Sequence, residues 1–242
     1  YNGRMKYHSL SEQNNELKNE LNIMANYSLP SWYTDRNPNS LNDVKNELDN
    51  CKGEISTIII YGLPNKDCSG GESSAGSNKN SNDYIKFITD LKNTVNDNPV
   101  IYIIEPDALS LTVNQGCGLK NNYIENIKSA LNVLSENIKA EIYMDIGYWI
   151  LNNGDDQIKD FLNIINQIDS LKRIKGFSLN LSNYRLTDES INSCKKVREI
   201  SGNDYKCIID TSRNANGPSS NNVWCNLKSA GIGEPPTDNT GF

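Results

Sequence analysis

Apolar segments of strand length recur along the chain, with longer segments of mixed polarity between them. Continuous apolar runs rich in β-branched residues are typical of strands that are covered on both faces. The pattern predicts six such strands, over residues 29–34, 55–61, 100–104, 141–146, 176–181 and 206–210.

The segments between these strands place apolar residues at helical spacing, which predicts amphipathic helices. Thr187, followed by Asp188 and Glu189, predicts a helix N-cap and an acidic first turn. A further helix is expected near the N-terminus, before the first strand. The apolar stripes are Tyr84, Ile88, Leu91 and Val95; Ile124, Ile127, Leu131, Leu134 and Ile138; Ile158, Phe161, Leu162, Ile165 and Ile168; and Leu17, Leu21 and Met24.

Regular alternation of strands and helices predicts an α/β fold with parallel strands and right-handed crossovers. A (β/α) barrel is favoured over an open doubly wound sheet, because no GxGxxG motif follows a strand. Long Gly-, Ser- and Asn-rich loops at 68–82 and 212–223 follow strands, where sites form in such folds. A closed barrel needs more than six strands, so we expect the natural protein to continue beyond Phe242.

Composition narrows the classes of function. The 242 residues are expected to form one domain, residues 1–242, with a formal net charge of −6. Basic residues are scattered, so nucleic acid is not an expected partner. No apolar run approaches the roughly 20 residues that span a bilayer, so a membrane is not expected either.

Six cysteines and a single histidine, His8, bear on metals and on the cellular compartment. The chain has no CxxC pair, which argues against a zinc site, and we expect no metal or other cofactor. An even number of widely spaced cysteines favours disulfides in a secreted protein, with buried free thiols of a cytosolic protein as the alternative.

Polar side chains stand where the predicted strands end. Acidic residues follow four of the strands, and they converge on one face of a parallel barrel. Crowded carboxylates raise at least one pKa, which a general acid near neutral pH requires. A single Asp after a strand is more often a turn or cap residue, but the repetition favours a site. The residues are Asp67, Asp107, Asp145, Asn180, Asn183 and Asp210.

Acids without a catalytic histidine or a phosphate loop indicate glycoside hydrolysis, in which two carboxyl groups perform the chemistry. Aromatic faces bind sugar rings, and Trp32, Trp149 and Trp224 fall at or after predicted strand ends. Core packing is the alternative interpretation for each tryptophan, and for Trp149 core packing and sugar binding are equally favoured.

Five motifs occur in order along the chain: 61-YGLPNKDC-68, 104-IEPD-107, 143-YMDIG-147, 180-NLSNY-184, and 209-IDTSRNANGP-218 with 224-WCN-226. Together they resemble the cellulases of glycoside hydrolase family 6. The resemblance implies a distorted, TIM-like, seven-stranded (β/α) barrel that is cut short here at the C-terminus. It also implies hydrolysis of β-1,4-glucan with inversion, in a secreted, extracellular enzyme.

The resemblance assigns roles by position. Asp107 would be the general acid, Asp67 would keep it protonated, and Ser73 would help hold the attacking water. Tyr61 would press the sugar toward a distorted ring, and Asp145 would support the developing positive charge. The substrate-binding residues implied are Trp32, Trp224, Asn180, Asn183, Asp210 and Lys66.

The family also implies a disulfide between Cys68 and Cys117, and a partner for Cys225 beyond Phe242. Cys51, Cys194 and Cys207 have no family role, although the last two are placed to join a helix to the next strand.

The chain departs from the family at several positions. Lys66 replaces an arginine, Tyr148 replaces a histidine, and Leu151 stands where an aromatic platform is expected. The loop that carries the family's candidate general base is absent before Phe242, which leaves Asp67, acting through Ser73 and water, as the substitute.

The form of the loops favours endo-acting cleavage, with an exo-acting cellobiohydrolase and a non-catalytic β-glucan-binding protein as alternatives. The expected partner is a β-1,4-glucan or cello-oligosaccharide. We expect a monomer, attached in the full-length protein to a carbohydrate-binding or docking module.

Overall fold

The computed structural model describes residues 22, 27, 29–220, 223 and 225–240. The chain divides into two units, residues 30–234 and residues 1–29 with 235–242. The helix expected around Leu17, Leu21 and Met24, and the tryptophan at 224, lie outside the described residues. A single domain over residues 1–242 stays a prediction.

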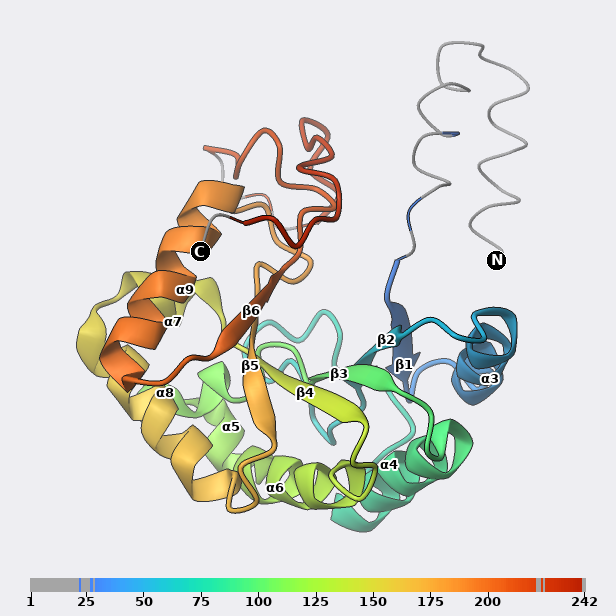
Figure 1. Cartoon of the computed structure of the whole chain (residues 1–242). Helices are drawn as coiled ribbons and strands as arrows, with labels where there is room; N and C mark the ends of the chain where they lie inside the picture. The colour runs from blue at the N-terminus through green and yellow to red at the C-terminus, as the bar shows by residue number, and fades with distance from the viewer. Residues whose placement is uncertain (1–21, 23–26, 28, 221–222, 224, 241–242) are drawn as a thin grey trace. The chain divides into compact units, whose positions relative to one another are not determined.

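Unit 30–234 is built on a parallel sheet whose strands follow the chain in order, β1-β2-β3-β4-β5-β6 (Figure 1). All six predicted strands are present, so the α/β class is confirmed. Within the described ranges the sheet has six strands, and the seventh strand of the implied barrel stays a prediction. The strands are β1 Ser31–Thr34, β2 Ser56–Tyr61, β3 Val100–Ile104, β4 Ala140–Asp145, β5 Ile174–Leu179 and β6 Lys206–Ile209.

Strand β5 begins and ends two residues before the predicted range of 176–181. Asn180 adopts a left-handed backbone with φ of 64°, which is incompatible with extended structure. The apolar residue that follows, Leu181, therefore belongs to the loop after the strand, although its hydrophobicity extended the pattern.

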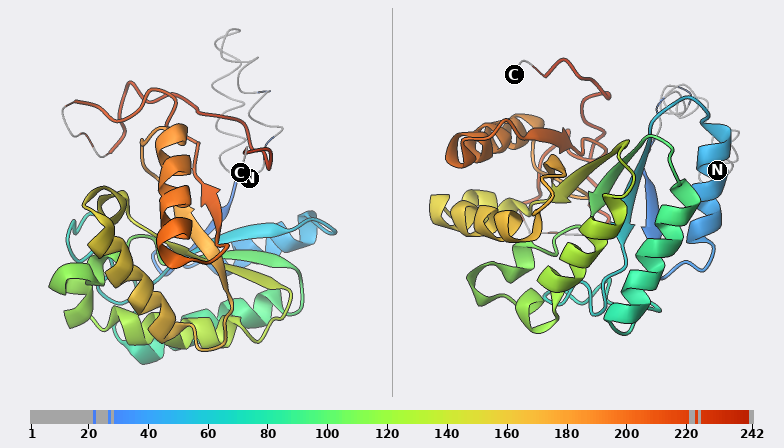
Figure 2. Two further views of the ribbon diagram at one scale, coloured as in Figure 1. Left: turned by 60° about the vertical axis from the view of Figure 1, so that its left-hand side comes forward. Right: turned by 60° about the horizontal axis from the view of Figure 1, so that its bottom comes forward.

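Five long helices lie between the strands and cover one side of the sheet (Figure 2). The stripes predicted for α4, α6 and α8 are confirmed, except that Ile138 lies past the end of α6 and is 82% exposed. The long helices are α3 Ser40–Asn50, α4 Ser81–Val95, α6 Tyr123–Leu134, α8 Asp155–Ile168 and α9 Thr187–Ser201, and the short ones are η1 Ser110–Gln115, α5 Cys117–Lys120 and α7 Tyr148–Asn152.

The predicted cap of α9 is wrong by one residue. Leu186 occupies the N-cap position, and Thr187 is already the first helical residue. The Thr187 hydroxyl instead accepts a hydrogen bond from Asn214 Nδ2 at 3.1 Å, so it ties the helix start to the loop after β6.

Alternation along the strands separates two faces of the sheet. The outer face packs against the helices and forms the main core, which includes Ile58, Tyr102 and Phe177. The inner face carries a smaller apolar cluster built on Ile59, Ile103 and Tyr143. Further along the strands, toward their carboxyl ends, the side chains that alternate onto this inner face lie beyond the small cluster.

Cys194 of α9 and Cys207 of β6 form a disulfide, as their positions in the sequence suggested. Cys51 and Cys225 carry no disulfide within the described part of the chain. None of the described helices combines the length and the apolar character needed to cross a membrane.

Substitution of Phe177 tests how tightly the outer core is packed. The ring is fully buried on β5 and meets Phe161 at 5.7 Å and Tyr205 at 4.8 Å between ring centroids. Phe177→Ala is expected to lower the free energy of unfolding by about 3–5 kcal/mol, because it leaves a cavity. Urea denaturation checks this, with the exposed Ile138→Ala as control, which should change stability by less than about 0.5 kcal/mol. Equal losses in both variants would contradict the packing described.

Candidate active site

The loops after β2, β3 and β5 share an unusual backbone. Six non-glycine residues in these loops have positive φ, in the left-handed region. Such conformations cost free energy and gather at functional sites. Two of them flank Pro106, so the chain reverses direction sharply where β3 ends. The six residues are Asn65, Asp67, Glu105, Asp107, Asn180 and Ser182.

Asp107 lies two residues beyond the motif's glutamate, at the carboxyl end of β3. Its backbone N–H donates a hydrogen bond to Asp145 Oδ2 at 2.9 Å. The side chain of Asp107 is exposed, whereas Asp145 is 4% exposed. The carboxyl group of Asp107 therefore reaches solvent while its main chain is fixed by a buried acid.

Asp145 is held from two sides. It pairs in register with Ser178 of β5, whose hydroxyl donates to Asp145 Oδ1 at 2.7 Å. With the Asp107 N–H on Oδ2, each carboxylate oxygen has a donor. Asp145 thereby ties together the ends of β3, β4 and β5. Ser178 was not among the predicted site residues, although it lies on the same inner face as Asn180, two residues further along the chain.

Protons bind unusually tightly to this pair of acids. Desolvation by the surrounding protein, followed by the charges of Asp145 and Asp67, raises the pKa of Asp107 to about 7. Burial also raises the pKa of Asp145, against the hydrogen bonds from Asp107 and Ser178. Two acids this close titrate as a pair, and one of them holds a proton at a pH where an isolated Asp has none.

Asp67 stands in the loop after β2 and accepts the Ser73 N–H on Oδ2 at 2.7 Å. The loop between them is tight, because a Cβ at Gly70 would lie 2.6 Å from Asp67 Oδ1. Ser73 contacts Asp67 through its main chain, and the family role of its hydroxyl in holding water stays a prediction.

Tyr61 ends β2 on the inner face and lies edge-on to Trp32 of β1, with ring centroids 5.9 Å apart. Trp32 is 40% exposed, which suits an aromatic platform. Burial and the neighbouring charges of Asp67 and Asp107 raise the pKa of Tyr61 well beyond its usual range. The phenol thus stays protonated beside the acids.

Glu105 was given no role from the sequence, yet it is 1% exposed and joins two strand ends. Its carboxylate accepts the Gly62 N–H at 2.9 and 3.1 Å and the Leu63 N–H at 3.3 Å. Burial raises the pKa of Glu105 to about 8, although the Gly62 bond opposes the rise. Glu105 fixes the chain just beyond Tyr61. A buried position next to a proline is not visible in sequence pattern alone.

Two expected substrate contacts are used inside the protein instead. Lys66 is 2% exposed and pairs with Asp35 at 2.6 Å. Asn180 is 5% exposed and donates to Asp210 O at 2.7 Å, while its Oδ1 accepts the Arg185 N–H at 2.8 Å. These positions depart from the prediction that both residues touch the sugar, because their polar atoms already have partners.

Asp210 and Asn183 stand at the rim of the same region, both half-buried. Asp210 accepts the Ser182 and Ser212 N–H groups, each at 2.8 Å, and its charge contributes to the raised pKa of Asp145. Asn183 Oδ1 accepts the Tyr184 N–H at 2.9 Å. Their contacts with substrate stay predictions.

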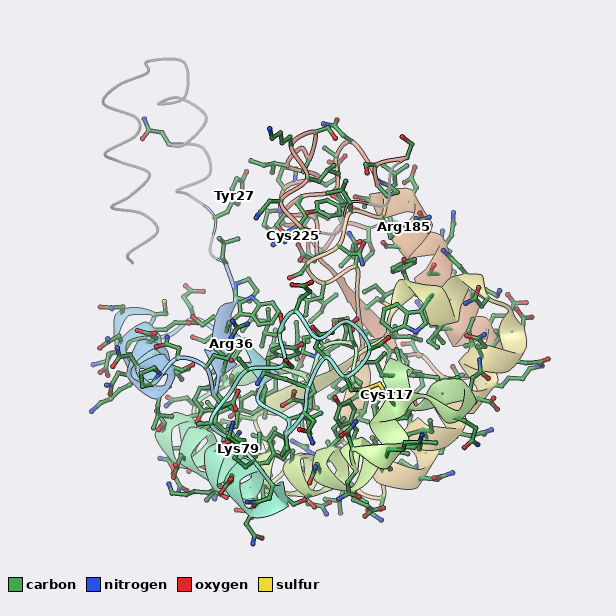
Figure 3. The ribbon with its side chains drawn as sticks, turned by 180° about the vertical axis from the view of Figure 1, so that it is seen from behind. Tyr27, Arg36, Lys79, Cys117, Arg185 and Cys225 are labelled. Atoms are coloured by element: carbon green, nitrogen blue, oxygen red, sulfur yellow. A yellow bond between two sulfur atoms is a disulfide. The ribbon has the colours of Figure 1, made fainter. Side chains whose placement is uncertain are left out.

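The disulfide between Cys68 and Cys117 is present, as the resemblance implied (Figure 3). It joins the loop after β2, directly after Asp67, to α5 in the connection after β3. The two loops that carry Asp67 and Asp107 are thus tied covalently, across 49 residues of sequence.

The region after β4 has aromatic residues, but not at the expected position. Leu151 is buried in the main core, and Trp149 is half-buried and packs against that core. Tyr148 meets Trp149 edge-on at 5.7 Å, and the Arg185 guanidinium lies 5.3 Å from the Tyr148 ring centroid. Core packing thus accounts for part of the Trp149 surface, as the alternative interpretation held.

Acids gathered at the carboxyl ends of a parallel α/β sheet are typical of enzymes that use carboxyl groups in catalysis. The family model described as "Glycosyl hydrolases family 6" matches residues 2–242. The chain belongs to this family, and the resemblance drawn from its motifs is confirmed.

The relatives of this chain include proteins named endoglucanase and proteins named cellobiohydrolase. Endoglucanase A of Thermobispora bispora is 29% identical over 223 residues, covering 87% of this chain and 46% of that protein. A probable 1,4-beta-D-glucan cellobiohydrolase C of Aspergillus niger is 28% identical over 219 residues, covering 76% of this chain and 48% of that protein. The chain thus spans less than half the length of these two relatives.

Among solved structures, the endoglucanase Cel6 of Mycobacterium tuberculosis aligns with a TM-score of 0.78 and 25% identity. The alignment covers 96% of this chain and 78% of that one. That structure is a complex with methyl-cellobiosyl-4-deoxy-4-thio-beta-D-cellobioside.

The raised pKa of Asp107 has a consequence for stability. Between the usual Asp value and about 7, the folded protein holds a proton that the unfolded chain has lost, so stability falls as the pH rises through this window. Asp107→Asn removes the destabilising negative charge and is expected to be more stable than the wild type at pH 8. The gain is expected to be only about 1 kcal/mol, because solvent screens the exposed carboxylate. Below about pH 4 the difference should vanish.

Urea denaturation at both pH values measures this difference. The exposed Asp97→Asn serves as control and should show no such dependence. A wild type as stable as Asp107→Asn at pH 8 would show that the acids do not repel one another as described.

Proposed function

We propose that this chain carries the catalytic part of a secreted cellulase that hydrolyses β-1,4-glucosidic bonds with inversion. The observation that carries the proposal is the setting of Asp107, an exposed carboxyl beside Asp145 and Asp67 whose pKa is raised to about 7. A general acid must hold its proton at working pH and reach its substrate, and this carboxyl does both.

Asp107 protonates the glycosidic oxygen as the bond to the leaving sugar breaks. Asp67, through its negative charge, keeps Asp107 protonated before that step. Water attacks the anomeric carbon from the opposite face, which gives inversion. The proton of that water passes to Asp67 by way of Ser73 and solvent. Asp145 stabilises the positive charge that develops on the sugar ring.

Tyr61 and Trp32 supply the aromatic surface. Their edge-on pair places an exposed indole beside a half-buried phenol. Sugar rings stack on such faces, so Trp32 binds a glucose unit on the non-reducing side while Tyr61 presses the neighbouring ring toward a distorted shape. Asn183 and Asp210 lie at the ends of neighbouring strands and are proposed to bind further sugar units, and the family resemblance assigns the tryptophan at 224 a similar role.

The substrate is a β-1,4-glucan, as the names of the relatives and the ligand of the M. tuberculosis enzyme suggest. We favour endo-acting cleavage, since the loop after β2 is short and the motif after β6 has the endo-acting form. Two disulfides support an oxidising, extracellular setting. We expect a monomer linked to a carbohydrate-binding or docking module.

Activity on soluble carboxymethylcellulose tests the proposal. Asp107→Asn is expected to lower the release of reducing sugar by about 10²–10⁴-fold, because the leaving oxygen loses its proton donor. In the wild type, kcat should fall as the pH rises through about 7, since Asp107 then loses its proton. Full activity in Asp107→Asn would refute the assignment.

The same assay separates the alternatives. A rapid fall in viscosity indicates endo-acting cleavage, and cellobiose release at constant viscosity indicates a cellobiohydrolase. Binding of the polymer without any release of sugar, in a protein with native circular dichroism, would support a non-catalytic β-glucan-binding protein.

A further inference from the structure

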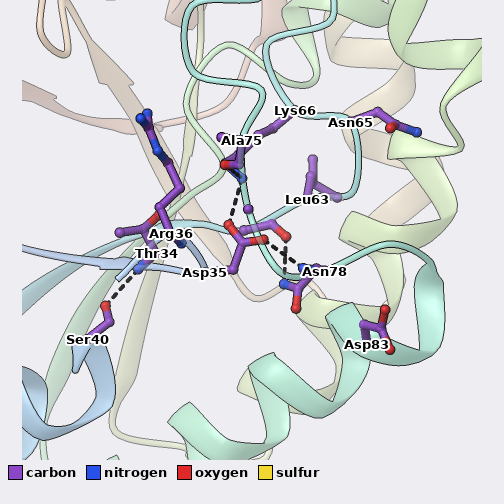
Figure 4. A network of polar contacts seen from close by, with 12 residues as sticks. Thr34, Asp35, Arg36, Ser40, Leu63, Asn65, Lys66, Ala75, Asn78 and Asp83 are labelled. Atoms are coloured by element: carbon purple, nitrogen blue, oxygen red, sulfur yellow. Dashed lines mark hydrogen bonds and ion pairs between the residues drawn. The ribbon is translucent and has the colours of Figure 1, made fainter. Parts of the chain in front are cut away.

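A buried acid stands at the end of β1, outside the set of catalytic carboxyls. The Asp35 side chain is 1% exposed. Its Oδ1 accepts a hydrogen bond from Lys66 Nζ at 2.6 Å, and its Oδ2 accepts the Asn78 N–H at 2.8 Å (Figure 4). A charge this deep is tolerated only when it is paired and hydrogen-bonded.

The two donors come from opposite ends of one loop. Lys66 stands directly before Asp67, and Asn78 lies shortly before α4. Lys66 Nζ also donates to Ala75 O at 2.8 Å, and the Ser77 N–H donates to the Asp35 carbonyl at 3.2 Å. Asp35 thereby closes the loop 66–78 upon itself and fastens it to β1.

The contacts continue to the other strand ends. Asn78 Nδ2 donates to the Gly62 carbonyl at 2.8 Å, and the Gly62 N–H donates to Glu105. An unbroken chain of buried polar contacts thus runs from the end of β1, through the end of β2, to the glutamate that precedes Asp107. Satisfied networks of this kind rigidify the backbone that they join.

The enclosed loop has little else to hold it. Glu72, Ser74 and Ala75 are exposed, as are Gly70 and Gly71. The disulfide at Cys68 anchors its beginning, and the Asp35 contacts anchor its far end. Asp67 and Ser73 lie between these two anchors.

We propose that Asp35 and Lys66 are positioning residues that hold Asp67 and Ser73 against Asp107. This inference rests on the proposed function. The buried Lys66 ammonium group pairs with Asp35 and bonds to the Ala75 carbonyl, so its charge stabilises the loop and does not contact the sugar. A shift of Asp67 by about 1 Å costs on the order of 100-fold in rate when geometry limits a reaction.

The proposal predicts an effect on the acid as well as on the rate. The charge of Asp67 helps to raise the pKa of Asp107. When the loop is released, that charge moves away and the pKa of Asp107 falls. Asp35→Asn is therefore expected to lower kcat by about 10–100-fold, with little change in KM, and to move the alkaline limb of the pH profile to lower pH.

Asp35→Asn leaves Lys66 buried without its counter-charge, and the variant will fold poorly if that cost dominates. Gly76→Ala is the second variant. Its backbone φ is not left-handed, yet the added methyl would overlap the Asp35 carboxylate. It displaces the loop without removing a charge, and the same loss of kcat and the same pH shift are expected. Lys66→Arg keeps the charge and should retain most of the activity.

A matched control is the exposed pair Lys86–Asp90, at 2.5 Å on α4. Asp90→Asn breaks an ion pair of similar length on the surface, and kcat, KM and the pH profile should stay as in the wild type. Hydrogen exchange, which needs no activity, completes the design. Asn78 and Ser73 N–H groups are both bonded to carboxylates, and both should exchange at least about 10-fold faster in Asp35→Asn or Gly76→Ala.

The outcomes separate the two proposals. Faster exchange at Ser73 in the two variants, together with a wild type that cleaves no glucan, would refute the proposed function and leave the positioning role standing. Unchanged exchange at Ser73, or a lowered kcat with an unmoved pH profile in both variants, would overturn the positioning role in an active enzyme.

Discussion

Repulsion among acids dominates the carboxyl edge of the sheet. Parallel strands bring their carboxyl ends to one edge of the sheet, and here Asp67, Asp107, Asp145 and Asp210 all arrive at that edge. The fold tolerates them because main-chain N–H groups and Ser178 neutralise part of the charge. The remainder is relieved by a retained proton, which lies on the Asp107–Asp145 pair. Under the proposed function, Asp107 would donate this same retained proton to the glycosidic oxygen.

Backbone strain and buried polar contacts have different roles at this edge of the sheet. Backbones in the left-handed region aim Asp67 and Asp107 away from their strands, and buried polar groups keep these conformations from relaxing. Glu105 and Asp35 do so through buried hydrogen bonds, whereas the disulfide Cys68–Cys117 does so covalently. Asp107 remains exposed, whereas the side chains of Glu105 and Asp35 are buried.

The elements of the fold were readable because burial on both faces leaves a continuous apolar signal, as in Val100–Ile104. Boundaries were wrong where the local backbone conformation set them: the left-handed Asn180 ended β5 early, and Leu186 took the cap position of α9. Candidate acids were readable from their place after strands. The direction in which a side chain points could not be predicted from the sequence. Lys66 and Asn180 were therefore assigned to the sugar, although both are buried. Asp35 also follows a strand directly, and the same rule applied to β1 would have found it.

The strand order has a consequence for how the chain reaches this state. Within the described residues, every pair of neighbouring strands is also consecutive in sequence, so none of these ladders joins segments that are distant in the strand order. The sheet can therefore assemble in the direction of synthesis, one βα unit after another, with the most recent strand as a temporary edge. Acids at successive strand ends meet one at a time during this growth. Electrostatic cost thus accumulates gradually, after neighbouring hydrophobic layers have already formed.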